Sequence, residues 1–196
     1  MINPTDYEWL RWTGAAILGI LLALGAFIIS RYPFEKQTSI SRQIASNPLH
    51  YTLMALLLTF GGAVFYGFLI LWLVPTYHIS QYIYILLGIA FIAQLTLAWV
   101  PDKNPTNTLN RRLHLIHYGG GMVVAGVMTI CLYFLCASYQ FLPLLSLVFV
   151  IGSTIFSTAC VVLYSFFKKT RQHFLIYEII FISLFSIAIF SLILGF

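Results

Sequence analysis

Residues 174–195 read FLIYEIIFISLFSIAIFSLILG, an apolar run whose only charged side chain is Glu178. At about 1.5 Å per residue, a helix of this length covers the roughly 30 Å of hydrocarbon in a bilayer. The segment therefore predicts a transmembrane helix.

Five further apolar stretches resemble this one in length and character. They run approximately over residues 13–30, 52–74, 82–100, 117–138 and 143–167. Every proline falls outside these stretches or at an edge: Pro4, Pro33, Pro48, Pro75, Pro101, Pro105 and Pro143. Proline inside a helix removes a backbone hydrogen bond that lipid cannot replace, so this placement supports the boundaries. We predict an all-α polytopic membrane protein, a six-helix transmembrane bundle forming a single domain over residues 1–196.

The composition argues against a water-soluble fold. Of the 196 residues, 61% are hydrophobic and 8% are charged, and a domain of this size cannot bury so much apolar surface in its own interior. The net charge of +5 does not indicate nucleic-acid binding, because the basic residues form separate clusters and no continuous basic face. The three cysteines lie within apolar runs and are interpreted as small hydrophobic residues.

The basic residues orient the predicted bundle. Nine of the ten follow the first, third and fifth spans: Arg31, Lys36, Arg42, Lys103, Arg111, Arg112, Lys168, Lys169 and Arg171. Short loops rich in Lys and Arg are retained in the cytoplasm. Both termini are therefore expected on the non-cytoplasmic side of the membrane.

Ionisable side chains are expected to gather at the cytoplasmic edge of this bundle. Glu178 lies near the start of the last span, where an acid usually faces other helices and has a partner. In RRLHLIHYGGG, residues 111–121, polar residues recur at helical spacing and share one face. The ionisable residues expected at this edge are His50, Asp102, Arg111, Arg112, His114, His117 and Glu178. Further along the same helix, Gly121 and Ala125 have the small-xxx-small spacing that favours close helix packing.

Several chemistries fit these residues. His114, His117 and Asp102 form a candidate metal site, with zinc as the metal, which Glu178 could complete to activate water in a hydrolase. Alternatively, these side chains tie loops to helix ends by hydrogen bonds. Haem is disfavoured, because it usually needs histidines from facing helices and here the close pair lies on one helix. A separate basic cluster is a candidate site for lipid headgroups: Lys168, Lys169 and Arg171.

Four short motifs follow one another along the chain: SISRQIASNP after the first span, VPDKNPT closing the third, RRLHLIH opening the fourth helix and IYEII near the start of the sixth. In this order they resemble the bacterial "domain of unknown function 998" family of six-span membrane proteins, which is similar in layout to the eukaryotic Frag1/DRAM/Sfk1 group. The resemblance implies a bacterial inner membrane and supplies no reaction. It also implies that the family's characteristic positions are Ser39, Ser41, Asp102, His114 or His117, and Glu178.

The leading hypothesis is a lipid-interacting or partner-binding module that acts through its polar cytoplasmic face. Basic side chains beside a membrane attract anionic headgroups at about 1 kcal/mol per charge. The expected partners are membrane lipids, with a homo-oligomer or another membrane protein as further partners and no nucleic acid. Two alternatives stay open: a metal-dependent intramembrane hydrolase acting on a lipid-like substrate, and an accessory subunit of a membrane complex.

Overall fold

The computed structural model describes residues 3–31, 40–103, 106–166 and 174–195, and within these ranges it contains helices and turns but no strand. The α-helices are α1 (Glu8–Arg31), α2 (Ile40–Ile44), α3 (Pro48–Phe68), α4 (Val74–Thr76), α5 (Ile83–Trp99), α6 (Thr108–Ala137), α7 (Leu144–Phe166) and α8 (Phe174–Leu194). Two 3-10 turns, Pro4–Tyr7 and Tyr139–Phe141, and a π-helical turn, Leu69–Leu73, complete the described secondary structure. The prediction of an all-α chain is confirmed for the described residues.

Among the described residues, four helical segments are long and apolar enough to cross a membrane: Pro48–Thr76, Thr108–Ala137, Leu144–Leu163 and Ile176–Leu194. Ile83–Trp99 is a shorter apolar helix. Large apolar side chains also cover the outside of these helices, with Phe60, Ile85 and Leu144 exposed by 68%, 69% and 79%. Apolar surface of this extent is unfavourable in water and ordinary in lipid, so the helices fit an integral membrane protein.

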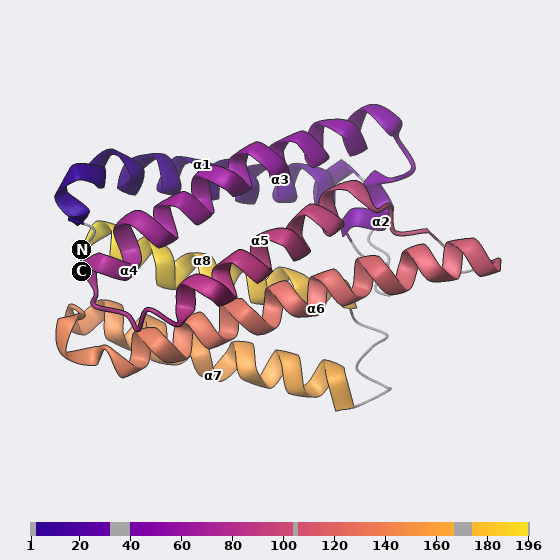
Figure 1. Cartoon of the computed structure of the whole chain (residues 1–196). Coiled ribbons are helices and arrows are strands. Elements are labelled where there is room, and N and C mark those ends of the chain that lie inside the picture. Colours follow the sequence, from indigo (N-terminus) through magenta and orange to yellow (C-terminus); the bar gives the residue numbers. More distant parts are fainter. Residues whose placement is uncertain (1–2, 32–39, 104–105, 167–173, 196) are drawn as a thin grey trace.

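In the part of the chain that the structure describes, six long helices, α1, α3, α5, α6, α7 and α8, run back and forth along one axis. Long helices that follow one another in the chain are antiparallel (Figure 1). Successive long helices pack against each other from α1 through α3, α5, α6 and α7 to α8, and α8 also contacts α1. The six therefore close into a ring. Both chain ends lie at one end of the ring, and α2 lies at the other (Figure 1).

An apolar core fills the inside of the ring. Its fully buried side chains include Phe68, Leu73, Leu87, Leu132 and Ile189, which come from α3, the π-helical turn, α5, α6 and α8. Lipid is as apolar as this core, so helix association in a membrane depends on close packing and on hydrogen bonds between helices.

Hydroxyl side chains supply such hydrogen bonds where α7 meets α8. Ser146, Ser153 and Ser157 are all buried and follow one face of α7. Ser146 Oγ donates to the carbonyl of Ser191 at 3.0 Å, and Ser153 Oγ donates to the carbonyl of Leu184 at 2.8 Å. These small side chains let the two backbones approach while each of the two donors keeps a partner.

Three helices begin or end several residues away from the sequence-based prediction. The span predicted at 13–30 belongs to a helix that already begins at Glu8. The span predicted at 117–138 belongs to a helix that already begins at Thr108, where the Asn107 side chain caps it by accepting from the Asn110 N–H at 2.8 Å. Its first turns extend past the rest of the bundle (Figure 1). The span predicted at 52–74 continues to Thr76, so Pro75 lies within the helical run. The π-helical turn before it, in which the Val74 N–H bonds to the Leu69 carbonyl, accommodates the proline.

Candidate functional site

Asp102 is the centre of a buried ion-pair network at the α2 end of the bundle. It follows α5 and is 4% exposed. Its Oδ1 accepts from Arg42 Nη2 at 3.1 Å and lies 2.8 Å from His114 Nδ1. Arg42 Nη2 is also 3.3 Å from His114 Nδ1. A buried carboxylate requires a paired charge and hydrogen bonds. Arg42 of α2 and His114 of α6 supply them to Asp102, which lies in the α5–α6 connection.

His117 lies one helical turn beyond His114 and is 6% exposed. Its Nδ1 lies 2.6 Å from the carbonyl oxygen of Val100, the C-cap residue that follows α5. A carbonyl oxygen can only accept, so Nδ1 carries the proton in this contact. In the neutral ring the other nitrogen, Nε2, is then an acceptor.

Glu178 connects α8 to α2. The Ile40 backbone N–H, at the first residue of α2, donates to Glu178 Oε2 at 3.1 Å. The N–H groups of a first helical turn have no partner within the helix, so this carboxylate satisfies one of them. Ile40 and Ile44 are also buried and pack with Tyr51 and Ile179. The short helix α2 is thus attached to α8 by Glu178 and to the α5–α6 connection by Arg42.

A cavity of about 200 Å³ lies between α5, α6, α7 and α8. Its walls are mostly apolar and include Leu97, Gly121, Ala125, Val161 and Phe181. A Cβ added at Gly121 would meet only Leu97, at 3.7 Å, so the missing side chain leaves space there. The small residues Gly121 and Ala125, which the sequence suggested as a helix-packing face, line this cavity.

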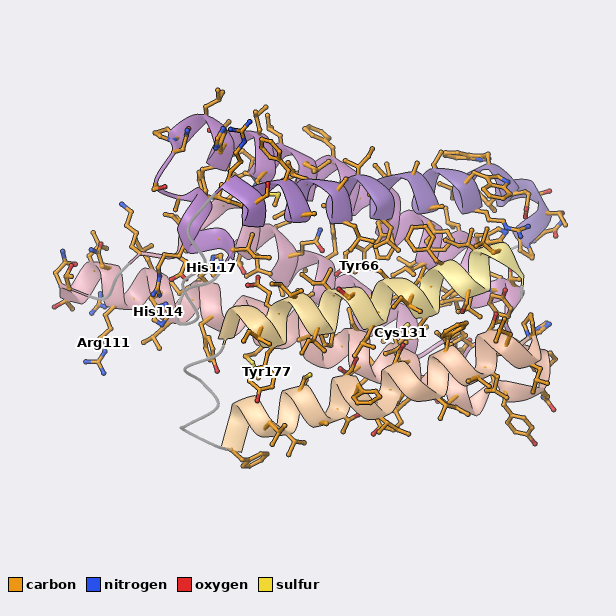
Figure 2. The ribbon with its side chains drawn as sticks, turned by 180° about the vertical axis from the view of Figure 1, so that it is seen from behind. Tyr66, Arg111, His114, His117, Cys131 and Tyr177 are labelled. Carbon is orange, nitrogen blue, oxygen red and sulfur yellow. The ribbon has the colours of Figure 1, made fainter. Side chains whose placement is uncertain are left out.

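The polar groups of the cavity are His117, Tyr118, Tyr177 and Glu178. They come from the beginning of α8 and from the part of α6 that follows its projecting turns. Figure 2 shows His117 and Tyr177 in the half of the bundle nearer to the projecting end of α6, whereas Tyr66 and Cys131 lie deeper along the axis. The cavity is therefore amphiphilic, with apolar walls and polar groups contributed by α6 and α8.

The predicted site residues divide into four groups. The structure brings Asp102 and His114 into direct contact and places His117 and Glu178 on one cavity. Arg111 is exposed and points away from the bundle (Figure 2), and Arg112 is exposed as well. Both lie on the turns by which α6 extends past the other described helices (Figure 1). Ser41 lies on α2, and His50 lies in the first turn of α3. Four predicted residues lie outside the described residues: Ser39, Lys168, Lys169 and Arg171.

The three predicted zinc ligands are not assembled as a metal site. His114 Nδ1 lies 2.8 Å from Asp102 Oδ1, and His117 Nδ1 lies 2.6 Å from the Val100 carbonyl oxygen, which leaves Nε2 of His117 as an acceptor. Asp102 Oδ1 also accepts from Arg42, which is the arrangement of an ion pair. Across the described ranges, no group of three or more His, Cys, Asp or Glu side chains could hold a metal ion. The observed contacts correspond to the alternative in which these residues join loops to helix ends.

A second polar cluster at the opposite end was missed by sequence reasoning. Glu8 accepts from Arg11 Nη1 at 2.8 Å and from Trp72 Nε1 at 2.7 Å. Arg11 Nε donates to the Ile193 carbonyl at 2.6 Å, and the Tyr77 hydroxyl donates to the Leu192 carbonyl at 2.7 Å. The hydrogen bond from Arg11 lowers the pKa of the Glu8 carboxyl, with Trp72 adding to the effect and desolvation opposing it. Because Arg11 and Tyr77 donate to the Ile193 and Leu192 carbonyls, the cluster caps the end of α8, whose last carbonyls have no partner within the helix.

Removing this cap should measurably weaken the bundle. Arg11→Met keeps an apolar stem and removes the donors to Glu8 and to the Ile193 carbonyl. We expect a loss of about 1–2 kcal/mol, because the lost hydrogen bonds involve a charged group that retains some exposure. Thermal unfolding in detergent would measure it, with Arg112→Met on the projecting turns of α6 as the matched control. Equal unfolding temperatures for the two variants would contradict a capping role.

Comparisons of the chain with protein-family models, with curated proteins and with solved structures found no match. The resemblance carried by the four sequence motifs therefore stays a prediction. The candidate site is thus characterised by its geometry, a buried ion-pair network beside an amphiphilic cavity.

Proposed function

We propose that this protein is a six-span integral membrane protein that binds a single-chain or similarly slender amphiphilic lipid in the cavity between α5, α6, α7 and α8. The observation that carries the proposal is the composition of that cavity, with mostly apolar walls and with His117, Tyr118, Tyr177 and Glu178 among its lining residues. Ligand sites commonly combine apolar walls with a few polar groups that set the orientation of the ligand.

The size and position of the cavity favour hydrocarbon as its occupant. Its volume of about 200 Å³ is below the roughly 300–1,000 Å³ typical of pockets for drug-sized ligands, which favours one chain over a bulky ring system. Ile182 lines the cavity and is 38% exposed. We infer that a chain enters sideways from the bilayer beside this residue.

Blocking the cavity provides the direct test. Gly121→Phe places a ring in the cavity, whereas a Cβ at Gly126, on the same helix, meets nothing within 4 Å, so Gly126→Phe is the control. We expect the wild-type chain and the control to retain lipid after gentle purification, and Gly121→Phe to lose most of it, as read by native mass spectrometry. A folded Gly121→Phe variant that retains as much lipid as the wild type would overturn the proposal.

The six-span arrangement is the second part of this proposal. It is supported by the length of α1, 24 residues on the same axis as the other long helices, and by the location of both chain ends at one end of the ring (Figure 1). We take residues 13–30 as the membrane-crossing part of α1. An even number of crossings returns both termini to the same side, and the basic connections favour the cytoplasm for the opposite side.

Cysteine accessibility would test this orientation. In a chain whose native cysteines are replaced by Ala, Asn3→Cys should react with an impermeant maleimide in intact bacterial spheroplasts. Lys103→Cys should react only after the membrane is permeabilised. The reverse pattern would invert the proposed orientation, and labelling of both positions from outside would rule out six spans.

A further inference from the structure

The cavity lining contains two hydrogen-bond acceptors, Glu178 and His117, which favour some lipid headgroups over others. We infer that the bound amphiphile presents a hydrogen-bond donor, a primary amine or a hydroxyl, to Glu178 and His117, and that carboxylate and phosphate headgroups are disfavoured. This inference rests on the lipid-binding cavity proposed above and names the class of its ligand.

Glu178 is the first of the two acceptors. It lines the cavity while its Oε2 accepts from the Ile40 N–H. The two oxygens of a carboxyl group offer several lone-pair positions, so one backbone N–H leaves capacity for a donor on the ligand. An ammonium headgroup would also supply the opposite charge that an acid within a membrane usually requires.

His117 is the second acceptor, and its orientation follows from the fold. Its Nδ1 lies 2.6 Å from the Val100 carbonyl, which requires the proton on that nitrogen. In a neutral imidazole, Nε2 then has a lone pair and no proton. His117 lines the cavity, so α5 determines through Val100 which role the ring can offer to a ligand.

The charges around the cavity also favour a headgroup that donates a hydrogen bond. Among the described residues that line it there is no Lys or Arg. Arg42, a nearby cation of α2, is engaged with Asp102 and His114 instead. A carboxylate or phosphate headgroup would thus meet Glu178 without a described cation in the lining. Two acids at short distance in a medium of low dielectric constant can both be ionised only at a high electrostatic cost. Tyr118 and Tyr177 can donate or accept, so they do not oppose this selectivity.

Probes with one tail and three headgroups test the inference. Decylamine, 1-decanol and decanoate would be titrated into the full-length protein in a non-ionic detergent, and binding measured by calorimetry after subtraction of the signal from Gly121→Phe. We expect decylamine to bind at least tenfold more tightly than decanoate, with 1-decanol between them. If no probe binds above the Gly121→Phe signal, the lipid-binding cavity itself is refuted.

A charge-neutral variant separates the headgroup from the tail. Glu178→Gln keeps an oxygen that can accept from the Ile40 N–H but loses the charge, so decylamine should weaken about tenfold while 1-decanol changes less. Glu8→Gln, at the other end of the bundle, is the control and should leave the series unchanged. If decanoate binds the wild type as tightly as decylamine, or if folded Glu178→Gln binds decylamine unchanged, the inference fails while the cavity stands. Should Glu178→Gln not fold, the order of the three probes on the wild type still decides.

Discussion

Asp102→Ala should destabilise the protein by about 3 kcal/mol, because it leaves Arg42 and His114 in a partly buried site without their shared carboxylate. The value lies at the lower end of the range for breaking a buried ion pair, since the Arg42 and His114 side chains are 24% and 31% exposed. The loss should also release α2 from the α5–α6 connection. Thermal unfolding of the purified protein in detergent, followed by circular dichroism, measures the effect.

Two further substitutions make this prediction specific to the ion pair. Asp102→Asn keeps the shape and one acceptor oxygen, so its effect should be intermediate between the wild type and Asp102→Ala. Lys103→Ala changes the exposed neighbouring residue and should leave stability within about 0.5 kcal/mol of the wild type. An Asp102→Ala variant as stable as Lys103→Ala would show that the network has no structural role.

Adding one methyl group at Gly120 should destabilise the protein by about 1–3 kcal/mol, whereas the same change at the adjacent Gly119 should not. A Cβ at Gly120 would collide with Thr96 Oγ1 and would lie 3.1 Å from the Ala93 carbonyl oxygen, both on α5. Thr96 is itself hydrogen-bonded to that carbonyl at 2.6 Å, so it cannot move aside without losing a partner. Gly120→Ala should therefore push α6 away from α5.

Gly119 is the matched control for this prediction. A Cβ there would meet nothing within 4 Å, and alanine favours a helix over glycine by up to about 1 kcal/mol. Gly119→Ala should hence unfold at the same temperature as the wild type or at a higher one, so the two neighbouring changes should have opposite or clearly different effects. Equal destabilisation by both variants would contradict the close approach of α5 and α6.

The helical segments were predictable because the requirement for them is local. A run of about 20 apolar residues can satisfy its backbone in lipid only by forming a helix or a closed barrel, so positions such as 174–195 identify themselves without reference to other parts of the chain. The beginning of α6 was missed because residues 108–116 are too polar to belong to an apolar run. Asn107 is a typical N-cap residue, however, and it was the available signal for that earlier start.

The candidate site was predictable in its members but only partly in its contacts. Helical spacing and common depth grouped Asp102 with His114, and these two do meet. Arg42 was interpreted as a topology signal, and its pairing with Asp102 requires α2 to fold back onto the α5–α6 connection. Arg111 shares a helical face with His114, yet it lies where α6 extends past its neighbours, which spacing along one helix cannot reveal.

The amino-acid pattern alone was enough to predict a helical chain that is apolar on all sides and suited to a membrane, with its few ionisable groups near helix ends. These properties follow from composition and period along single segments. Three features became visible only in the packed bundle. Gly121 and Ala125 border a cavity instead of a tight helix contact, Val100 after α5 holds the Nδ1 proton of His117, and Arg11 caps α8. A cavity, like a hydrogen bond between helices, depends on which faces of separate helices are turned toward one another. Apolar segments in lipid carry little local information about which of their faces will pack together.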